Sequence, residues 1–241
     1  MKQSALLATP RHPLVSLLRH RWLAASSIIS AALGAPAPVA GATGGGVSGT
    51  VKVLEDGKAT SDNSGVVVYL ENVPGGEVDA SKIVKAINQR DKQFRPGKLV
   101  VQKGSTVTFP NDDKIFHNVF SLSKAARFDL GLYKSGTSKS VKMRRTGVVD
   151  VYCNIHPDMV AKILVIDTKY YAETNNAGQF SISGVPDGTY NLVGWQMFGD
   201  SYKGQVTISD GKVTDHSFSL EEGSGSNQHK RKDGTPYGRY K

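Results

Sequence analysis

The chain has 241 residues, 39% of them hydrophobic and 21% charged, with a formal net charge of +9 and one cysteine. This length and composition allow one or two globular domains with substantial cores. Residues 1–42 and 223–241 each carry a net charge of about +4, so the net charge of residues 43–222 is only about +1. A nucleic-acid-binding protein needs basic residues clustered on a folded face, so the charge distribution argues against nucleic acid as a partner.

Residues 1–42 have the pattern of a cleaved export signal. Four basic residues and no acid accompany an apolar run, WLAASSIISAALGAPAPVA, which ends on the small residues Ala40, Gly41 and Ala42. Ser, Gly and Pro interrupt the run, and it is shorter than the roughly 20 residues that a membrane span needs. We therefore expect a periplasmic or secreted protein with no membrane span in its mature form.

Short strand patterns dominate the rest of the chain. They are rich in Val, Ile, Thr and aromatic residues, and Gly, Pro, Asn or Asp residues bound them. They are SGTVKVLE, SGVVVYLE, GKLVVQKGSTVTF, KSVKM, GVVDVYC, AKILVID, GQFSIS, TYNLVGW, KGQVTIS and DHSFSLE. Residues 80–89 fit a helical turn or a strand, and we favour a strand because a loop follows. Turn sequences such as Asn111–Asp113 and Asn175–Gly178 separate the strands, so we predict an all-β chain built from sandwiches.

The stretch VYCNIHPDM holds the chain's only cysteine. An exported protein usually pairs its cysteines, so an unpaired Cys153 suggests a buried inert thiol or a thiolate held by a metal. His156 and Met159 follow it at intervals of three, and His117 lies 36 residues upstream at the end of a different strand. Two imidazoles, one thiolate and a weak thioether are the ligands of a type 1 copper ion. The sequence therefore predicts one such ion.

The motifs FHNVFS and YCNIHPDM resemble the cupredoxins, the plastocyanin and amicyanin group, over roughly residues 82–167. The resemblance implies a Greek-key β-sandwich over about 80–168, with copper at one end. It also implies that His117, Cys153, His156 and Met159 are the ligands. Asn118 corresponds to the family residue whose side chain hydrogen-bonds the ligand loop.

Residues 89–159 also contain, in order, QRDKQFRP, FPNDD, FHNVFS, FDLGLY and CNIHPDM. This order resembles a group of bacterial exported proteins labelled methylamine utilisation proteins. The FDLGLY segment is a departure from plastocyanin and amicyanin.

A second sandwich is expected after the copper loop. The pieces GQFSIS, GVPDGTY and the strands after them resemble the carboxypeptidase regulatory-like domain, a small transthyretin-like β-sandwich without catalytic residues of its own. Its core would contain Phe180, Ile182, Tyr190, Leu192 and Trp195. The opening strands of such a domain occur only upstream, so we expect a discontinuous domain of residues 47–72 and 169–222. The alternative is that 48–72 supplies edge strands to the cupredoxin.

Rival interpretations of the copper motif are weaker. If Cys153 and His117 were only core residues, there would be no reason for four potential copper ligands to occur at this spacing. A thiol nucleophile would leave Met159 without a role. A multicopper enzyme needs further histidines, and His216 and His229 are expected to be bystanders. Residues 223–241 have the composition of a disordered basic tail.

We therefore expect a one-electron carrier and not an enzyme. Val119, Phe116 and Ile155 should cover the copper, and His156, beside Pro157, should be the port for transient contact with a redox partner protein. A copper-delivery module without an electron partner, or a structural exported protein with a vestigial site, would use the same residues.

Overall fold

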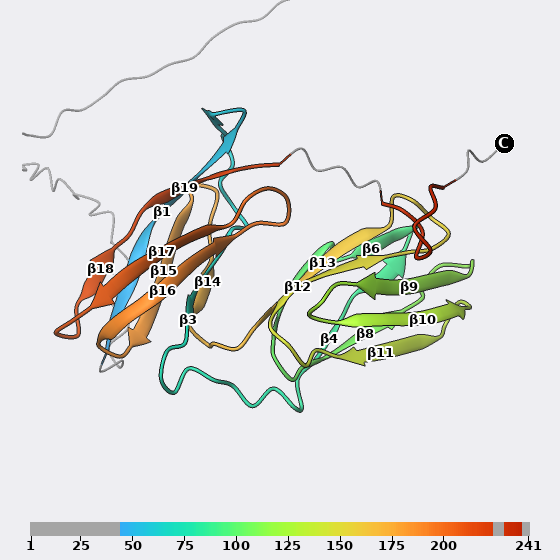
Figure 1. The fold of residues 1–241 in the computed structure, drawn as a ribbon, viewed down its shortest axis with the longest axis horizontal. Helices are drawn as coiled ribbons and strands as arrows, with labels where there is room; N and C mark the ends of the chain where they lie inside the picture. Colours follow the sequence, from blue (N-terminus) through green and yellow to red (C-terminus); the bar gives the residue numbers. More distant parts are fainter. Residues whose placement is uncertain (1–43, 224–228, 238–241) are drawn as a thin grey trace, which may run out of the picture. The chain divides into compact units, whose positions relative to one another are not determined.

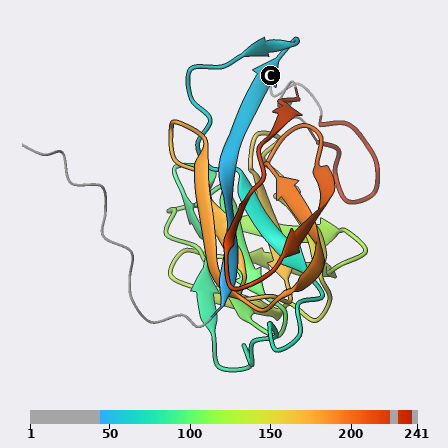
Figure 2. The same ribbon diagram turned by 90° about the vertical axis from the view of Figure 1, so that its left-hand side faces the viewer.

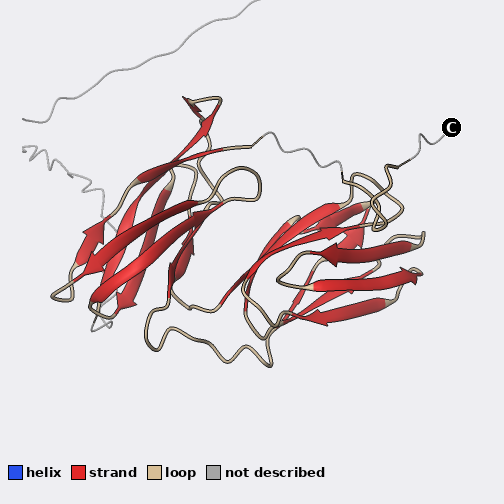
Figure 3. Cartoon of the chain, viewed as in Figure 1, coloured by secondary structure: helices blue, strands red, loops and turns tan. Residues whose placement is uncertain are grey.

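The computed structural model describes residues 44–223 and 229–237, which contain strands and loops but no helix (Figure 3). This confirms the predicted all-β class, and none of these residues lies in a helix that could cross a membrane. The expected signal segment lies outside the described residues. The strands are β1 (Gly45–Glu55), β2 (Lys58–Ala59), β3 (Val67–Glu71), β4 (Val84–Ala86), β5 (Asn88–Arg90), β6 (Gln93–Arg95), β7 (Lys98–Gln102), β8 (Thr106–Pro110), β9 (His117–Leu122), β10 (Arg127–Tyr133), β11 (Ser138–Lys142), β12 (Gly147–Tyr152), β13 (Val160–Ile166), β14 (Tyr171–Glu173), β15 (Gln179–Val185), β16 (Gly188–Trp195), β17 (Tyr202–Ile208), β18 (Val213–Asp215) and β19 (Phe218–Glu221).

The strands β4 to β13 form a first sandwich, which we call the central sandwich (Figure 1). One sheet has the order β10-β9-β12-β13-β7 and the other the order β11-β8-β4, with the short pair β5-β6 beside them. Between the sheets lies a core that includes Phe109, Val119, Met143, Val151 and Ile163, each with no exposed surface. Burying a side chain of this size stabilises the fold by about 1.5–3 kcal/mol, so this core holds the strands and the loops between them in fixed positions.

The remaining strands form a second sandwich, which we call the split sandwich because its strands come from both sides of the central one in the sequence. One sheet is centred on β1, which pairs with β15, β18, β19 and β2; the other has the order β14-β3-β16-β17. Figure 2 shows β1, in blue, running beside the red strands from the far end of the chain. Residues 47–72 were expected to supply the opening strands of a discontinuous domain. In this segment β1 pairs with β15, β18 and β19, and β3 pairs with β14 and β16, which all follow the central sandwich in the sequence.

Side-chain alternation explains these strands. In β15 the side chains of Phe180, Ile182 and Val185 enter the core, whereas Gln179 before them and the two serines between them face solvent. The turn before β15 needs Gly178, whose φ is +77° and whose carbonyl accepts a hydrogen bond from the Val51 amide (2.9 Å). A Cβ at that position would lie 2.0 Å from the Val51 carbonyl oxygen. A glycine is therefore required there, as the predicted turn suggests.

One expected strand segment is confirmed and one strand was not expected. Residues 80–89 contain the short strand β4 and most of β5, which agrees with the preference for strand over helix. β10 was not among the predicted strands. Its register with β9 shifts between Asp129 and Leu132, and Gly131 has a φ of +65°. This irregularity breaks the alternation on which strand prediction depends.

Candidate metal centre

A turn that Asn111 organises holds His117 at the start of β9. The buried Asn111 side chain donates to the carbonyl oxygens of Ile115 (2.9 Å) and Tyr133 (3.1 Å). Its Oδ1 accepts a hydrogen bond from the amide of Asp113 (3.0 Å). An Asn side chain that bonds the backbone two residues further on is an Asx turn, as the Asn-Asp-Asp sequence favours. The turn brings Asp113 and the fully buried His117 to one point.

A seven-residue loop joins β12 to β13 and carries Cys153, His156 and Met159. Cys153 and Met159 have no exposed surface, and His156 is partly buried. The Cys153 amide donates to the Met159 carbonyl, and the Met159 amide donates to the His156 carbonyl, both at 3.3 Å. The loop is thereby folded back on itself, and both sulfur-bearing residues belong to the core of the central sandwich.

Three ligand atoms from β9 and this loop converge. The Nδ1 atoms of His117 and His156 lie 3.1 Å apart, and the Cys153 Sγ lies 3.9 Å and 3.6 Å from them, respectively. Two donor atoms bound to one ion at about 2.0–2.3 Å lie roughly 3–4 Å apart at the usual angles. These three residues form the group in the described part of the chain that could hold a metal ion. Residues that are up to 39 positions apart in the sequence thus form a donor set with the spacing that one metal ion requires.

Asp113 fixes the tautomer of His117. Its Oδ2 lies 2.7 Å from His117 Nε2, so that nitrogen carries the hydrogen and Nδ1 presents its lone pair to the cluster. Burial by itself raises the pKa of Asp113, but hydrogen bonds from the Lys92 amide, from His117 and from the Asp91 amide outweigh it, so the pKa is lowered. An ionised carboxylate behind a ligand histidine orients the ring and makes the ligand more basic.

The Cys153 sulfur lies in an apolar, amide-lined position. Burial raises the pKa of its thiol, and hydrogen bonds from the backbone amides of Asn118, Ile155 and His156 offset only part of that rise. A bound metal ion deprotonates such a thiol because its charge is the largest in the site. The amides that face the sulfur would then stabilise the thiolate.

His156 lies at the boundary with solvent. Burial, the facing His117 and Lys92 lower its pKa, so its imidazole is neutral at neutral pH and able to bind a metal. A surface concavity of about 320 Å³ is lined by Lys92, His156, Pro157 and Asp158. This residue therefore connects the buried sulfur with the surface.

Of the three apolar residues expected to cover the metal ligands, one is fully buried, one is partly buried and one is exposed. Val119 is fully buried and Ile155 is partly buried against the core, as expected. The expectation for Phe116 was wrong, because its side chain is 57% exposed. Phe116 lies outside because β9, with its inward-facing residues, begins only at His117. Ile115 and Leu132 are also exposed apolar side chains, and Leu132 pairs with Asn118 on the neighbouring strand.

Asn118 also differs from the role that the resemblance implied. Its side-chain Nδ2 donates to Asp129 Oδ1 (2.7 Å), and its Oδ1 has no hydrogen-bond partner among the described residues. Its backbone amide, not its side chain, hydrogen-bonds the Cys153 sulfur. The residue still borders the cluster, but its side chain points toward β10.

Asp113 was missed by the sequence analysis, although an Asp four residues before a candidate ligand is a usable signal. The two histidines expected to be bystanders lie outside the three-residue cluster. His216 contacts the Tyr202 hydroxyl in the split sandwich (2.9 Å), and His229 stacks on Tyr152 (4.3 Å between ring centroids).

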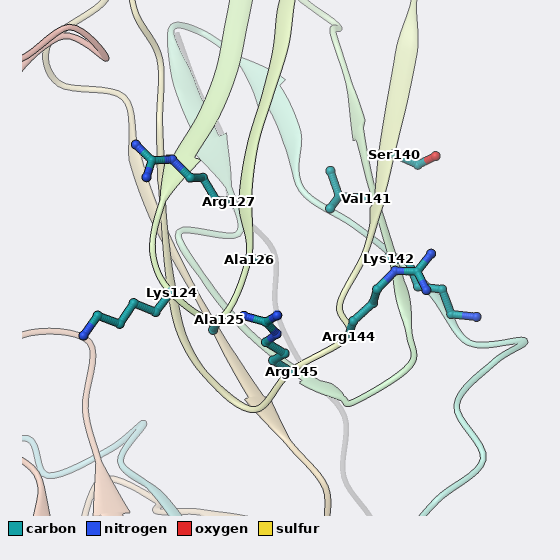
Figure 4. Close-up of a pocket in the computed structure, with 9 residues that line it drawn as sticks. All are labelled: Lys124, Ala125, Ala126, Arg127, Ser140, Val141, Lys142, Arg144 and Arg145. Carbon is teal, nitrogen blue, oxygen red and sulfur yellow. The ribbon is translucent and has the colours of Figure 1, made fainter.

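A larger concavity, of about 560 Å³, has no part in this cluster. Figure 4 shows its lining, which consists of Lys124, Ala125, Ala126, Arg127, Ser140, Val141, Lys142, Arg144 and Arg145. Arg127 pairs with Leu122, five residues along β9 from His117, which corresponds to roughly 16 Å. The basic concavity therefore lies at the opposite end of this hairpin from the ligands.

Comparison with known proteins agrees with this geometry. Residues 81–166 match the family model for copper binding proteins, plastocyanin/azurin family, which is roughly a third of the chain. Residues 156–216 match the model for polysaccharide lyase family 4, domain II. No curated protein matches the sequence.

The solved structures to which part of this chain is similar include cupredoxins. The Cu(I) form of an amicyanin mutant is 20% identical, with 41% of this chain and 98% of that chain covered and a TM-score of 0.33. A purple cupredoxin from Nitrosopumilus maritimus is 25% identical, with 34% and 98% covered and a TM-score of 0.31. A copper-containing nitrite reductase from Thermus scotoductus is 21% identical, with 35% of this chain and 22% of that chain covered and a TM-score of 0.33. The plastocyanin/azurin match and the cluster of His117, Cys153 and His156, with Met159, fit a cupredoxin domain with a single type 1 copper ion.

Proposed function

We propose that this chain is an exported one-electron carrier whose copper ion is held by His117, Cys153, His156 and Met159. The observation that carries the proposal is the convergence of two imidazole nitrogens and one sulfur within 3.1–3.9 Å in a buried position. Bound copper supplies the one-electron couple. The protein supplies a donor set that suits both oxidation states.

Each ligand has a distinct part in this proposal. The Cys153 thiolate and the Nδ1 atoms of His117 and His156 would be the strong ligands of the ion, and the Met159 thioether would be a weak ligand. Asp113 orients His117, and the backbone amides around the sulfur hold its charge. These fixed contacts limit the movement of the ligands when the charge of the site changes by one unit.

Electrons would enter and leave through His156. Its partly buried ring lines a surface concavity, whereas the other ring nitrogen of His117 is engaged by Asp113. The exposed apolar side chains of Phe116 and Ile115, next to His117, are suited to brief contact with a partner protein. Weak redox encounters use small interfaces of this kind.

The remaining assignments belong to the same proposal. The basic and then apolar pattern of residues 1–42 supports export to the periplasm or the outside of the cell. We assign no catalytic role, because a type 1 centre needs a second reactive site before it can process a substrate. We propose that the split sandwich is a non-catalytic domain of the carboxypeptidase regulatory-like type, and that the chain belongs with the methylamine utilisation proteins. The ordered motifs in residues 89–159 support the second assignment.

The test begins with Cu(II) added to the mature protein. The wild type should develop the intense blue, green or purple colour of a thiolate–copper site, and Cys153→Ser should remain colourless while it stays folded. A reversible redox potential with fast electron exchange supports the carrier, whereas rapid transfer of copper to an acceptor supports delivery. A wild-type protein that binds copper without colour would refute the type 1 assignment.

A further inference from the structure

The described part of the C-terminal segment, residues 229–237, lies against the ligand loop. The His229 ring stacks on Tyr152, the residue before Cys153, with centroids 4.3 Å apart and an interplanar angle of 23°. Tyr237 meets the His229 ring edge-on at 5.1 Å. The sequence predicted a solvated tail here. The three aromatic rings instead anchor this segment, coloured dark red in Figure 1, on β12 of the central sandwich.

Hydrogen bonds also join the segment to the loop itself. The Tyr237 hydroxyl donates to the backbone carbonyl oxygen of Cys153 (2.5 Å). The Lys232 amide donates to the side-chain Oδ1 of Asn154 (2.9 Å). Both are shorter than the 3.3 Å bonds that the loop makes within itself, between Cys153, His156 and Met159. Hydrogen bonds weaken beyond about 3.2 Å, so the loop's firmest backbone restraint comes from outside it.

The segment also contacts β10. Lys232 Nζ contacts Asp129 Oδ2 (2.5 Å), and Asp129 Oδ1 accepts a hydrogen bond from the Asn118 side chain (2.7 Å). The Asn118 amide is one of those that face the Cys153 sulfur. Lys232 therefore acts through Asp129 on the backbone next to His117. Contacts of one short segment restrain both chain pieces that carry the ligands.

We propose that residues 229–237 are a clamp that positions the Cys153–Met159 loop, with Tyr237 and Lys232 as positioning residues. Its effect on copper rests on the proposed function, whereas its effect on the loop does not. The clamp contacts Cys153 and Asn154, and its His229 ring also interacts with the His156 backbone, whereas none of the clamp residues lines the concavity at His156 and Pro157. It can therefore stiffen the site while leaving that concavity to a partner.

The test uses the mature protein without copper, a truncation after Gly223, and the single substitution Tyr237→Phe. Tyr237→Phe removes one hydroxyl and keeps the aromatic ring. Tyr171→Phe is the matched control, because Tyr171 is an exposed tyrosine of the split sandwich. Amide hydrogen exchange of residues 153–159 should be about tenfold faster in the truncated protein and about twofold to fivefold faster in Tyr237→Phe. Exchange in β13 and in the Tyr171→Phe control should stay at the wild-type rate.

With copper bound, the same two variants should release the metal several-fold faster and shift the thiolate–copper absorption band. The clamp is overturned if exchange of the loop in both variants stays within experimental error of the wild type. It is also overturned if β13 and the loop accelerate equally in Tyr237→Phe, since that outcome indicates general destabilisation. A colourless wild type would refute the proposed function alone, because the exchange experiment needs no metal.

Discussion

Asp113→Asn isolates the contribution of the carboxylate behind His117. Asp113 accepts hydrogen bonds from His117 Nε2 (2.7 Å) and from the amides of Asp91 (2.6 Å) and Lys92 (2.9 Å). Asparagine removes the negative charge and replaces one of the two acceptor oxygens with a donor. Loss of such a partner behind a metal ligand lowers metal affinity by about 10- to 100-fold. Loss of a hydrogen bond to a charged group also lowers the free energy of unfolding by about 1.5–3 kcal/mol.

The assay is a Cu(II) titration against a competing chelator, followed by the thiolate–copper absorbance. Urea unfolding of the metal-free protein gives the second quantity. Asp112→Asn is the matched control, because the neighbouring Asp112 is exposed and the chemical change is the same. The control should bind copper within about twofold of the wild type. If Asp113→Asn also binds within about twofold, the carboxylate does not orient His117 and our account of the tautomer fails.

Three further predictions concern stability. Burial and nearby carboxylates raise the pKa of Tyr69 to about 12, whereas an unfolded tyrosine has a pKa near 10. The contribution of Tyr69 to the free energy of unfolding is therefore complete below about pH 10 and is lost as the pH rises toward 12. Tyr69→Phe should make this decline in urea stability less steep, and an unchanged slope would contradict the raised pKa. The Tyr133 hydroxyl donates to a backbone carbonyl (2.9 Å) and accepts from Gln89 Nε2 (2.6 Å), so Tyr133→Phe should lower the free energy of unfolding by about 1–3 kcal/mol. Gly178→Ala should lower Tm in a thermal melt by more than a typical surface substitution, because its φ of +77° and the close approach of a carbonyl oxygen strain any side chain; an unchanged Tm would rule out this strain.

The sequence was most informative where a local pattern has one physical meaning. Alternating apolar residues gave the strand at 179–185, and the Asn-Asn-Ala-Gly run gave the turn before it. The regular spacing of Cys153, His156 and Met159 pointed to a metal because three ligand types on one short loop have few other uses. The irregular β10 was missed, since a bulge at Gly131 removes the alternation that identifies a strand.

Local pattern alone could not supply the contacts between distant segments. The carboxylate of Asp113 was missed because its role depends on the turn that Asn111 folds and on amides some 20 residues away. The exposure of Phe116 depends on where β9 begins. The packing of residues 229–237 on the ligand loop was not foreseen, because their composition is that of a solvated tail. The contacts that hold them there, the stacked rings and the hydrogen bonds of Lys232 and Tyr237, join residues about 80 to 100 positions apart.

Residue types and their spacing by themselves determined that this protein is all-β and that it carries the donor atoms of a copper site, because strand periodicity and ligand chemistry are local properties. The tertiary structure alone decided that His117 Nδ1 comes within 3.9 Å of the Cys153 sulfur. It also decided which charged groups face the rings of His117 and His156, and which residues contact the loop of residues 153–159. Those features depend on how the two sheets pack, and packing brings together residues whose distance along the chain carries no information about their distance in space.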